Sequence, residues 1–426
     1  MPAKAPNESN FHHFVPKSAL RRFTVDGAGK QIWVFDKSDG RSFPGGLKRT
    51  GSGQGYNTLR LSDGSLWNFE DAFQNIDDEF AATGNTLATR RRVDDLDPPF
   101  KAAVCTGVAV QFLRTPKVRT TLDRLPRQLV ERLVEAGLPA LDDPMPSEDD
   151  IRKITLDLIA NRDEIVEGLL TKIPILYEPA GGARFWTSDH PIVREGSTPD
   201  DRRGVKDLGV AFYAPISSDL LLGLVCPSIL AKLTDAPIER LELSANRKAR
   251  LLALRDGLLS GRPVPITDDQ VMDFNLKQVG GSERFVYAHE DAFEPARTWL
   301  KAHPEQRADA ALFSVGRMGS GPPRPEQFKE GQWLVLYGRD NWVQLPIGGY
   351  DPQRSLRQAW TDQPALLRSA MRHAPFAEAQ IYYPEGSEMI RDINVVILER
   401  GPRTRFKLVP SDPGMAQLDA MLRRGG

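Results

Sequence analysis

The chain has 426 residues, with 56 lysines and arginines against 57 aspartates and glutamates. This balance excludes a protein that is basic over its whole surface, as a nucleic-acid coat would be, although it permits a local basic patch. The apolar content of 40% is too high for a disordered chain, and the length suits two or three domains. Cys105 and Cys226, the two cysteines, lie in apolar stretches typical of core residues in a reducing compartment.

The N-terminal residues contain no apolar run of the kind that marks a signal peptide. The most apolar segment, Ala102–Leu113, is shorter than the ~20 residues that a membrane span needs. We therefore expect a cytoplasmic protein with no membrane partner.

In the first part of the chain, hydrophobic spacing predicts long helices that are separated by turns and proline breaks. Ser147 is a predicted N-cap at the end of a linker rich in proline and aspartate. In order, the predicted elements are a short helix after Pro16, a strand at Gln31–Asp36, a loop over residues 39–55, and helices over 66–87, 100–115, 121–137 and 148–171.

The second part is richer in strands, and a break at residues 301–330, with many prolines and glycines, is the best domain boundary. The predicted strands are 173–179, 183–189, 209–216, 219–225, 332–338, 341–347, 377–383 and 392–399, and the predicted helices are 227–234, 237–258, 271–291, 354–373 and 412–423. The sequence thus predicts an α+β protein, with a mostly helical domain around a mixed β-sheet over residues 10–300 and a smaller α+β accessory domain over residues 305–426.

His12 and His13 are adjacent, in a chain with six histidines, and they precede Pro16. Paired histidines of this kind occur in the first strand of ββα-metal nucleases, where one activates water and the other helps to hold a metal. Such folds also need an asparagine and a further histidine or asparagine on a following helix, whereas here Asn57 is the nearby asparagine and no histidine follows until His190. The alternative is a histidine pair that stabilises a turn by hydrogen bonds.

Gln111 and Arg114 continue the face of an apolar helix, and Arg119 follows just beyond Pro116. Burying such groups is costly unless they are hydrogen-bonded. Two fixed guanidinium groups would suit a phosphate or a carboxylate. The alternative is an internal ion pair with an acidic residue of the preceding helix: Glu70, Asp77 or Glu79.

Asp189 lies in the segment Thr187–Pro191, directly after a predicted strand, where proteins often display functional side chains. The same segment is equally typical of a turn. The acidic face of the 66–87 helix would suit Mg²⁺ or Mn²⁺ if its carboxylates met, and otherwise is a solvated helix face.

Several short motifs occur in a familiar order, among them HHFVPKSALRRF, FQNIDDEFA, QFLRTPKVR, FWTSDHPIV and FNLKQVGGSERFVYAHE. In this order they resemble the bacterial domain-of-unknown-function family 4238 over residues 10–293. The resemblance implies a candidate site but no reaction, and it adds Glu79 as a metal ligand and Asn275 as a substrate-binding residue. Lys17, Ser18, Asp77 and His190 depart from the family pattern.

Together these residues suit metal-assisted hydrolysis of phosphodiesters, with His12, His13 and Asp189 as catalytic groups. Gln111, Arg114, Arg119 and Asn275 would bind a nucleic acid or nucleotide, and Glu79 would hold Mg²⁺ or Mn²⁺. The alternative is a non-catalytic protein with a buried polar network or a pocket for an anionic ligand, and either would suit a bacterial defence or toxin component. In that case the C-terminal domain would engage a protein partner.

Overall fold

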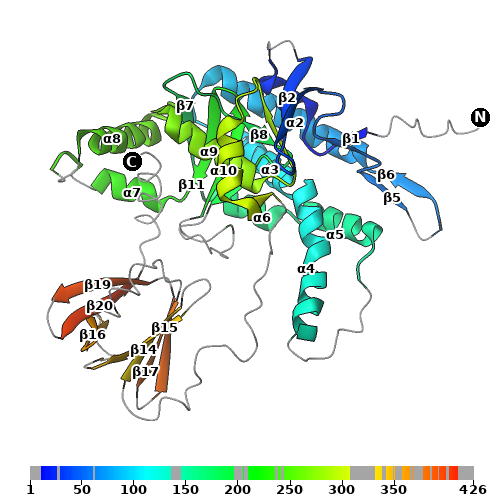
Figure 1. Cartoon of the computed structure of the whole chain (residues 1–426). Coiled ribbons are helices and arrows are strands. Elements are labelled where there is room, and N and C mark those ends of the chain that lie inside the picture. Colours follow the sequence, from blue (N-terminus) through cyan, green and yellow to red (C-terminus); the bar gives the residue numbers. More distant parts are fainter. Residues whose placement is uncertain are drawn as a thin grey trace, which may run out of the picture. The chain divides into compact units, whose positions relative to one another are not determined.

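The computed structural model describes residues 11–25, 29–60, 63–135, 145–195, 205, 210–235, 238–240, 244–307, 332–337, 342–348, 350, 357–364, 367, 378–383, 386–391, 393–399 and 403–410. The chain divides into two compact units (Figure 1). The first comprises Met1–Glu195, Arg203–Ser314 and Ala420–Gly426, and the second comprises Gly196–Arg202 and Val315–Asp419.

A mixed five-stranded sheet, of order β12-β7-β11-β10-β9, forms the centre of the first unit. β12 is parallel to β7, and the other neighbours are antiparallel. β10 and β11 are apolar on both faces, so helices cover both faces of the sheet (Figure 1). The strands are β7 (Ile173–Pro179), β9 (Val193–Glu195), β10 (Ala211–Ser217), β11 (Leu220–Val225) and β12 (Val264–Ile266).

The helices on one face of this sheet contribute Leu87, Val108 and Leu169 to a core shared with Phe212 and Leu222. On the other face, Phe274 packs against the rings of Tyr177 and Tyr213. The first set of helices is α2 (Glu70–Arg90), α3 (Pro98–Leu113) and α6 (Asp163–Leu170), and the second is α8 (Ala245–Ser260) and α9 (Asp268–Gly281).

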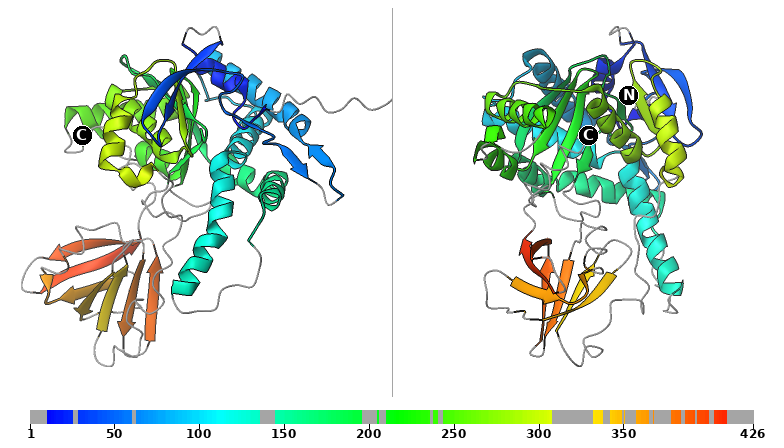
Figure 2. Two further views of the ribbon diagram at one scale, coloured as in Figure 1. Left: turned by 45° about the vertical axis from the view of Figure 1, so that its right-hand side comes forward. Right: turned by 60° about the vertical axis from the view of Figure 1, so that its left-hand side comes forward.

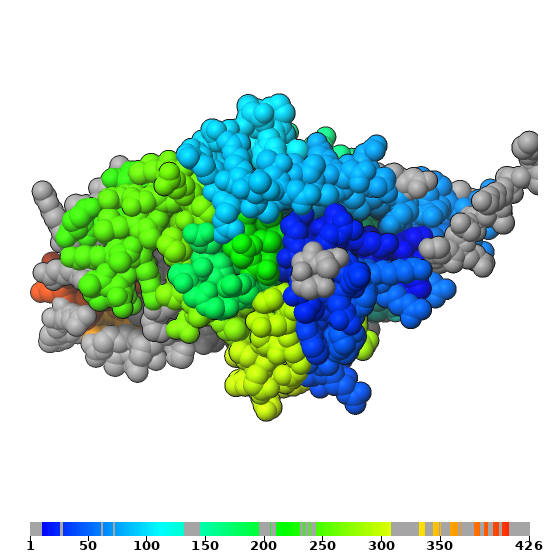
Figure 3. Space-filling model, turned by 90° about the horizontal axis from the view of Figure 1, so that it is seen from above, coloured from blue at the N-terminus to red at the C-terminus, as the bar shows by residue number. Residues whose placement is uncertain are grey.

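A second sheet, of order β3-β2-β13-β8, lies in the same unit. One face packs on the N-terminal segment through Phe14, Leu20 and Tyr287, and the other packs on α10 through Phe35 and Phe293. Figure 3 shows α10, in yellow, beside the blue part of the chain that contains the β2–β3 hairpin, to which Arg297 of α10 donates hydrogen bonds. The elements are α1 (Lys17–Leu20), η1 (Arg21–Phe23), β2 (Gln31–Asp36), β3 (Arg41–Gly46), β8 (Thr187–Ser188), β13 (Phe285–Ala288) and α10 (Glu294–Ala302).

Two short strand pairs and two helices complete the region that carries the candidate site. β1 pairs with β4, and β5 pairs with β6. α4 packs beside α5, as the cyan and green-cyan helices of Figure 2 show. Their bounds are β1 (Phe11–His13), β4 (Ser52–Gln54), β5 (Thr58–Arg60), β6 (Leu66–Asn68), α4 (Pro116–Glu135) and α5 (Glu148–Ala160); α7 (Ser228–Asp235), η2 (Ile238–Arg240) and η3 (Pro304–Gln306) lie elsewhere in the unit.

The second unit is built mainly of antiparallel strands in two sheets, of order β15-β14-β17-β18 and β16-β20-β19. Both sheets contribute to one core, in which Leu334 and Ile381 of the first meet Phe406 and Leu408 of the second. The strands are β14 (Gln332–Tyr337), β15 (Trp342–Ile347), β16 (Arg357–Thr361), β17 (Glu378–Tyr383), β18 (Gly386–Arg391), β19 (Ile393–Glu399) and β20 (Thr404–Pro410).

The α+β class predicted from the sequence is confirmed, and the sheet at the centre of the first unit is mixed, as predicted. The loop predicted over residues 39–55 is wrong, because it contains β3 and β4. Pro44 is tolerated there because β3 is an edge strand. Gly45 is needed because a Cβ at this position would lie 2.8 Å from Val34 Cγ2. Tertiary packing therefore selects strand where composition indicates a loop.

Several predicted helices are shorter than expected. The helix predicted over 271–291 ends at Gly281, and β13 follows it, because Phe285–Ala288 are β-formers that pair with β2. The helix over 148–171 is broken into α5 and α6, and the helix over 66–87 begins at Glu70 after a strand. Part of the helix over 354–373 is β16, whereas the helix over 412–423 lies outside the described residues.

Candidate functional site

His12 is anchored in the short pair of β1 and β4, where it lies opposite Gly53. Its side chain is buried, and its Nδ1 accepts a hydrogen bond from the backbone N–H of Asn57 at 2.8 Å. A ring nitrogen that accepts a hydrogen bond carries no proton, so the proton of the neutral ring lies on Nε2. This bond fixes the orientation of His12 against the loop that precedes β5.

Asn57 is a buried centre of hydrogen bonds between elements. Its side-chain Nδ2 donates to Glu70 Oε2, at the start of α2, and its Oδ1 accepts from Arg119 Nη2 at 3.5 Å. Glu70 Oε1 in turn accepts from the backbone N–H of His13 at 3.3 Å. Asn57 thus links the histidine pair, the acidic helix and Arg119.

The ring of His13 is buried, and neither of its nitrogens makes a hydrogen bond with good geometry. Burial lowers the pKa of this imidazole to about 4, and the positive charges of Lys17 and Arg114 contribute to the lowering. His13 is therefore neutral at neutral pH.

Gln111 and Arg114 form a buried network at the end of α3. Gln111 Nε2 and Arg114 Nε both donate to the carbonyl oxygen of Phe14, at 2.8 Å and 3.1 Å. Arg114 Nη2 also donates to Gln111 Oε1 at 3.0 Å, and Arg114 Nη1 donates to Asp77 at 2.6 Å. Of the three acidic partners considered from the sequence, Asp77 is the one that pairs with Arg114. Burial raises the pKa of Asp77, and the charge of Arg114 opposes that effect.

Asp189 is buried and receives three backbone hydrogen bonds. The N–H groups of Glu283, Arg284 and Phe285 each donate to its carboxylate at 2.8 Å. Burial raises the pKa of Asp189, whereas these three donors lower it. Its oxygens therefore hold the 187–191 turn against the start of β13.

Asn275 has a comparable role on α9. Its Oδ1 accepts from the backbone N–H of Trp186 at 2.7 Å, and its Nδ2 donates to the carbonyl oxygen of Arg184 at 2.8 Å. The amide thus pairs with a segment that leads into β8, as a neighbouring strand would. Asn275 is 1% exposed, and its bond to Trp186 is fully buried.

The end of α3 contacts both of the other candidate segments. The N-terminal segment reaches it through Phe14, which receives bonds from Gln111 and Arg114. The 187–191 turn reaches it through His190, whose Nδ1 lies 2.6 Å from the hydroxyl of Thr115. The structure therefore brings these three predicted segments together in the interior of the unit.

Arg119 differs from Arg114 because it faces a cavity of about 390 Å³. Its guanidinium carbon lies 3.5 Å from the centre of the Tyr56 ring, and its Nη1 donates to the carbonyl oxygen of Tyr56 at 2.6 Å. Within the described part of the chain, Arg119 has no carboxylate within 4.0 Å. Burial lowers its pKa, and the charge of nearby Arg152 contributes.

The other charged residues of this cavity are paired. Arg127 donates to Asp123 at 2.9 Å and 3.0 Å. Arg152 donates to Asp149 at 3.0 Å and also pairs with Glu148. The cavity is lined by Gln54, Tyr56, Arg119, Asp123, Arg127, Pro146, Ser147, Glu148, Ile151 and Arg152. Arg119 is therefore the lining arginine whose charge lacks a carboxylate partner among the described residues.

Glu79, the predicted metal ligand, lies exposed on α2, away from the Arg114 network that Asp77 joins. The described residues contain no group of three His, Cys, Asp or Glu side chains that could hold a metal ion. The expected Mg²⁺ or Mn²⁺ ion thus has no ligand set in this part of the chain. No described helix is long and apolar enough to cross a membrane.

Two residues around Arg119 were missed from the sequence: Tyr56 and Arg152. Tyr56 follows a glycine-rich stretch that was predicted to be a loop. Arg152 lies in the first turns of α5, beyond the N-cap at Ser147 that the sequence did predict. An arginine one turn after a helix start is common on protein surfaces, so this pattern alone does not indicate a site.

Comparison with known proteins identifies the family. Residues 12–292 match the family model described as "Protein of unknown function (DUF4238)". The chain belongs to this family. No curated protein and no solved structure matches the chain. In this DUF4238 protein, the matched region contains the histidine pair, the Arg114 network, Asp189 and the Arg119 cavity, whereas Val315–Asp419 of the second unit lie outside it.

Proposed function

We propose that the first unit of this DUF4238 protein binds a phosphate-bearing ligand of nucleotide size in the Arg119 cavity. The observation that carries the proposal is the Arg119 guanidinium, which is held against Tyr56 and has no carboxylate within 4.0 Å in the described residues. An anion in the cavity would offset this charge. A planar guanidinium also matches phosphate oxygens in pairs.

The size and composition of the cavity support the same ligand class. Its volume of about 390 Å³ lies within the range of roughly 300–1,000 Å³ that small-molecule sites occupy. Arg127 and Arg152 bring two further guanidinium groups, each already oriented by an acidic residue. Asp123 balances Arg127, and Glu148 and Asp149 pair with Arg152, so Arg119 is the lining cation that an anion in the cavity would contact directly.

The metal-assisted hydrolysis expected from the sequence stays a prediction. A general base must reach the proton that it removes. The carboxylate of Asp189 is occupied by three backbone N–H groups, and the ring of His13 is buried. Ligand binding at Arg119 is therefore the function that the geometry supports better. A protein partner for the C-terminal unit also stays a prediction.

Calorimetric titration of the full chain with AMP and with adenosine tests the proposal, because the two ligands differ only in the phosphate. We expect AMP to bind and adenosine to bind at least tenfold more weakly, since charged hydrogen bonds contribute about 1.5–3 kcal/mol each. Equal affinities, or no binding of AMP, would contradict it. Incubation of the same protein with DNA and RNA in Mg²⁺ or Mn²⁺ tests hydrolysis separately.

A further inference from the structure

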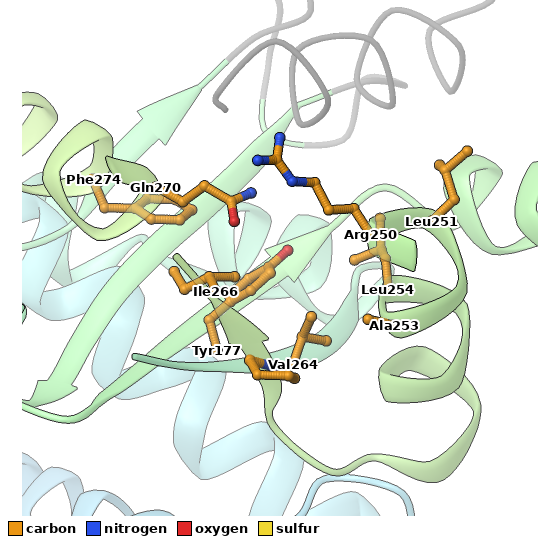
Figure 4. Close-up of a pocket in the computed structure, with 10 residues that line it drawn as sticks. Tyr177, Arg250, Leu251, Ala253, Leu254, Val264, Ile266, Gln270 and Phe274 are labelled. Carbon is orange, nitrogen blue, oxygen red and sulfur yellow. The ribbon is translucent and has the colours of Figure 1, made fainter. Parts of the chain in front are cut away.

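A second pocket lies between α8 and α9, above the edge of the mixed sheet formed by β7 and β12 (Figure 4). Val264 and Ile266 of β12 form its floor, with Leu254 of α8 and Phe274 of α9 at its sides. α8 approaches β12 closely, since a Cβ at Gly257 would lie 2.2 Å from Val264 Cγ2. None of these residues belongs to the Arg119 cavity.

Three polar groups lie at the opening of this apolar pocket. Figure 4 shows the Arg250 guanidinium and the Gln270 carboxamide reaching over the floor, with the Tyr177 hydroxyl below them. The Gln270 Oε1 accepts from the backbone N–H of Thr267 at 3.1 Å, in the capping box of α9. This bond leaves the –NH₂ group of Gln270 on the side of Arg250 (Figure 4).

We propose that this pocket binds a small carboxylic acid with an apolar body. The apolar body would contact Val264, Ile266 and Leu254, and the carboxylate would accept hydrogen bonds from Arg250 and Gln270. An apolar cavity with a few converging donors is the usual form of a site for such ligands. A carboxylate is favoured over a neutral head group because Arg250 is a cation with a planar pair of donors.

The volume of the pocket limits the size of the ligand. The cavity measures about 50 Å³. On the same measure a single water needs roughly 10–15 Å³, so the space holds about three to five carbon-sized groups beside the carboxylate. The ligand is therefore a short aliphatic acid of about four to six carbons, and longer chains would extend into solvent.

Titration of the full chain with acetate, butyrate, hexanoate and octanoate tests the size of the site. We expect affinity to rise about threefold to fourfold per added methylene up to hexanoate, because each enters an apolar space, and to rise little from hexanoate to octanoate. Absence of saturable binding of butyrate and hexanoate would overturn the proposal. A steady rise through octanoate would overturn the assigned size and indicate non-specific apolar binding.

Substitutions in α8 test the assigned contacts. Arg250→Gln should weaken hexanoate about tenfold and leave 1-hexanol unchanged, because only the acid uses the guanidinium. Ala253→Phe should fill the pocket and abolish binding of both. Arg247→Gln is the matched control, since Arg247 is exposed on the same helix and does not line the pocket. Equal affinity of hexanoate for the Arg250 and Arg247 variants would overturn the role of Arg250.

Discussion

Arg114 donates a hydrogen bond to Asp77 at 2.6 Å, and the arginine side chain is only 3% exposed. The same guanidinium contacts Gln111 and the carbonyl oxygen of Phe14. Arg114 thus connects α3 with α2 and with the segment that follows the histidine pair. Its contacts are those of a residue that holds the fold together, whereas Arg119 presents its charge to a cavity.

Arg114→Ala should destabilise the protein strongly. The substitution leaves the carboxylate of Asp77 without its partner in a largely buried position, and breaking such a pair costs about 3–5 kcal/mol. The free energy of unfolding, measured with urea, checks this expectation. Arg92→Ala is the control, because Arg92 is exposed and pairs with Asp94 at the surface, and it should leave that free energy unchanged. Equal unfolding free energies for the two variants would contradict the assigned role.

Asp189→Asn should also destabilise the protein. The carboxylate accepts three backbone hydrogen bonds, and an amide both removes the charge and places N–H donors opposite other donors. We expect a loss of about 2–4 kcal/mol in the free energy of unfolding. Asp63→Asn changes an exposed side chain and serves as the comparison. A wild-type unfolding free energy for Asp189→Asn would show that the three bonds contribute little.

Protonation of His13 should make stability depend on pH. Burial lowers its pKa in the folded protein to about 4, whereas the unfolded chain has the ordinary value of 6.5. The unfolded state therefore binds more protons between these values, so stability is complete above pH 6.5 and falls as the pH falls toward 4. The expected loss from pH 7 to pH 5 is about 2 kcal/mol.

Urea unfolding of the wild type and of His13→Gln at pH 7 and pH 5 checks this dependence. The variant should lose less stability than the wild type over the same interval, because glutamine does not titrate. Parallel losses in the two proteins would assign the pH dependence to other groups. Asp77 and Asp189 have raised pKa values and act with the opposite sign, but both proteins contain them, so the difference between the wild type and His13→Gln isolates the contribution of His13.

Much of the fold could be predicted from local patterns. The apolar strands β7, β10 and β11 and the helix α3 follow from continuous apolar runs and proline stops. β3 and β4 could not be found in this way, because their glycines and Pro44 are typical of a loop. β13 could not be found either, because it follows α9 closely and its sequence was interpreted as more of the same helix. Pairing with distant residues decides these elements, and a single sequence does not reveal that pairing.

The candidate site, like the fold, could be predicted from the sequence only in part. Gln111 and Arg114 stand out in the sequence as polar residues that are costly to bury on an apolar helix, and the structure pairs them inside the fold. Whether a buried arginine binds a ligand or an internal carboxylate depends on where Asp77 lies in space, which spacing along the chain does not give. Asn57 was visible as a nearby asparagine, yet its role depends on contacts with α2 and α4.

The dissociation constant of AMP for Arg119→Gln, measured beside the wild type and Arg92→Gln, tests the central claim most directly. We predict that Arg119→Gln weakens AMP about 10-fold to 100-fold, because a charged hydrogen bond contributes about 1.5–3 kcal/mol, and that it keeps a cooperative unfolding transition. Arg92→Gln should bind AMP as the wild type does. Wild-type affinity for AMP in Arg119→Gln would contradict the account.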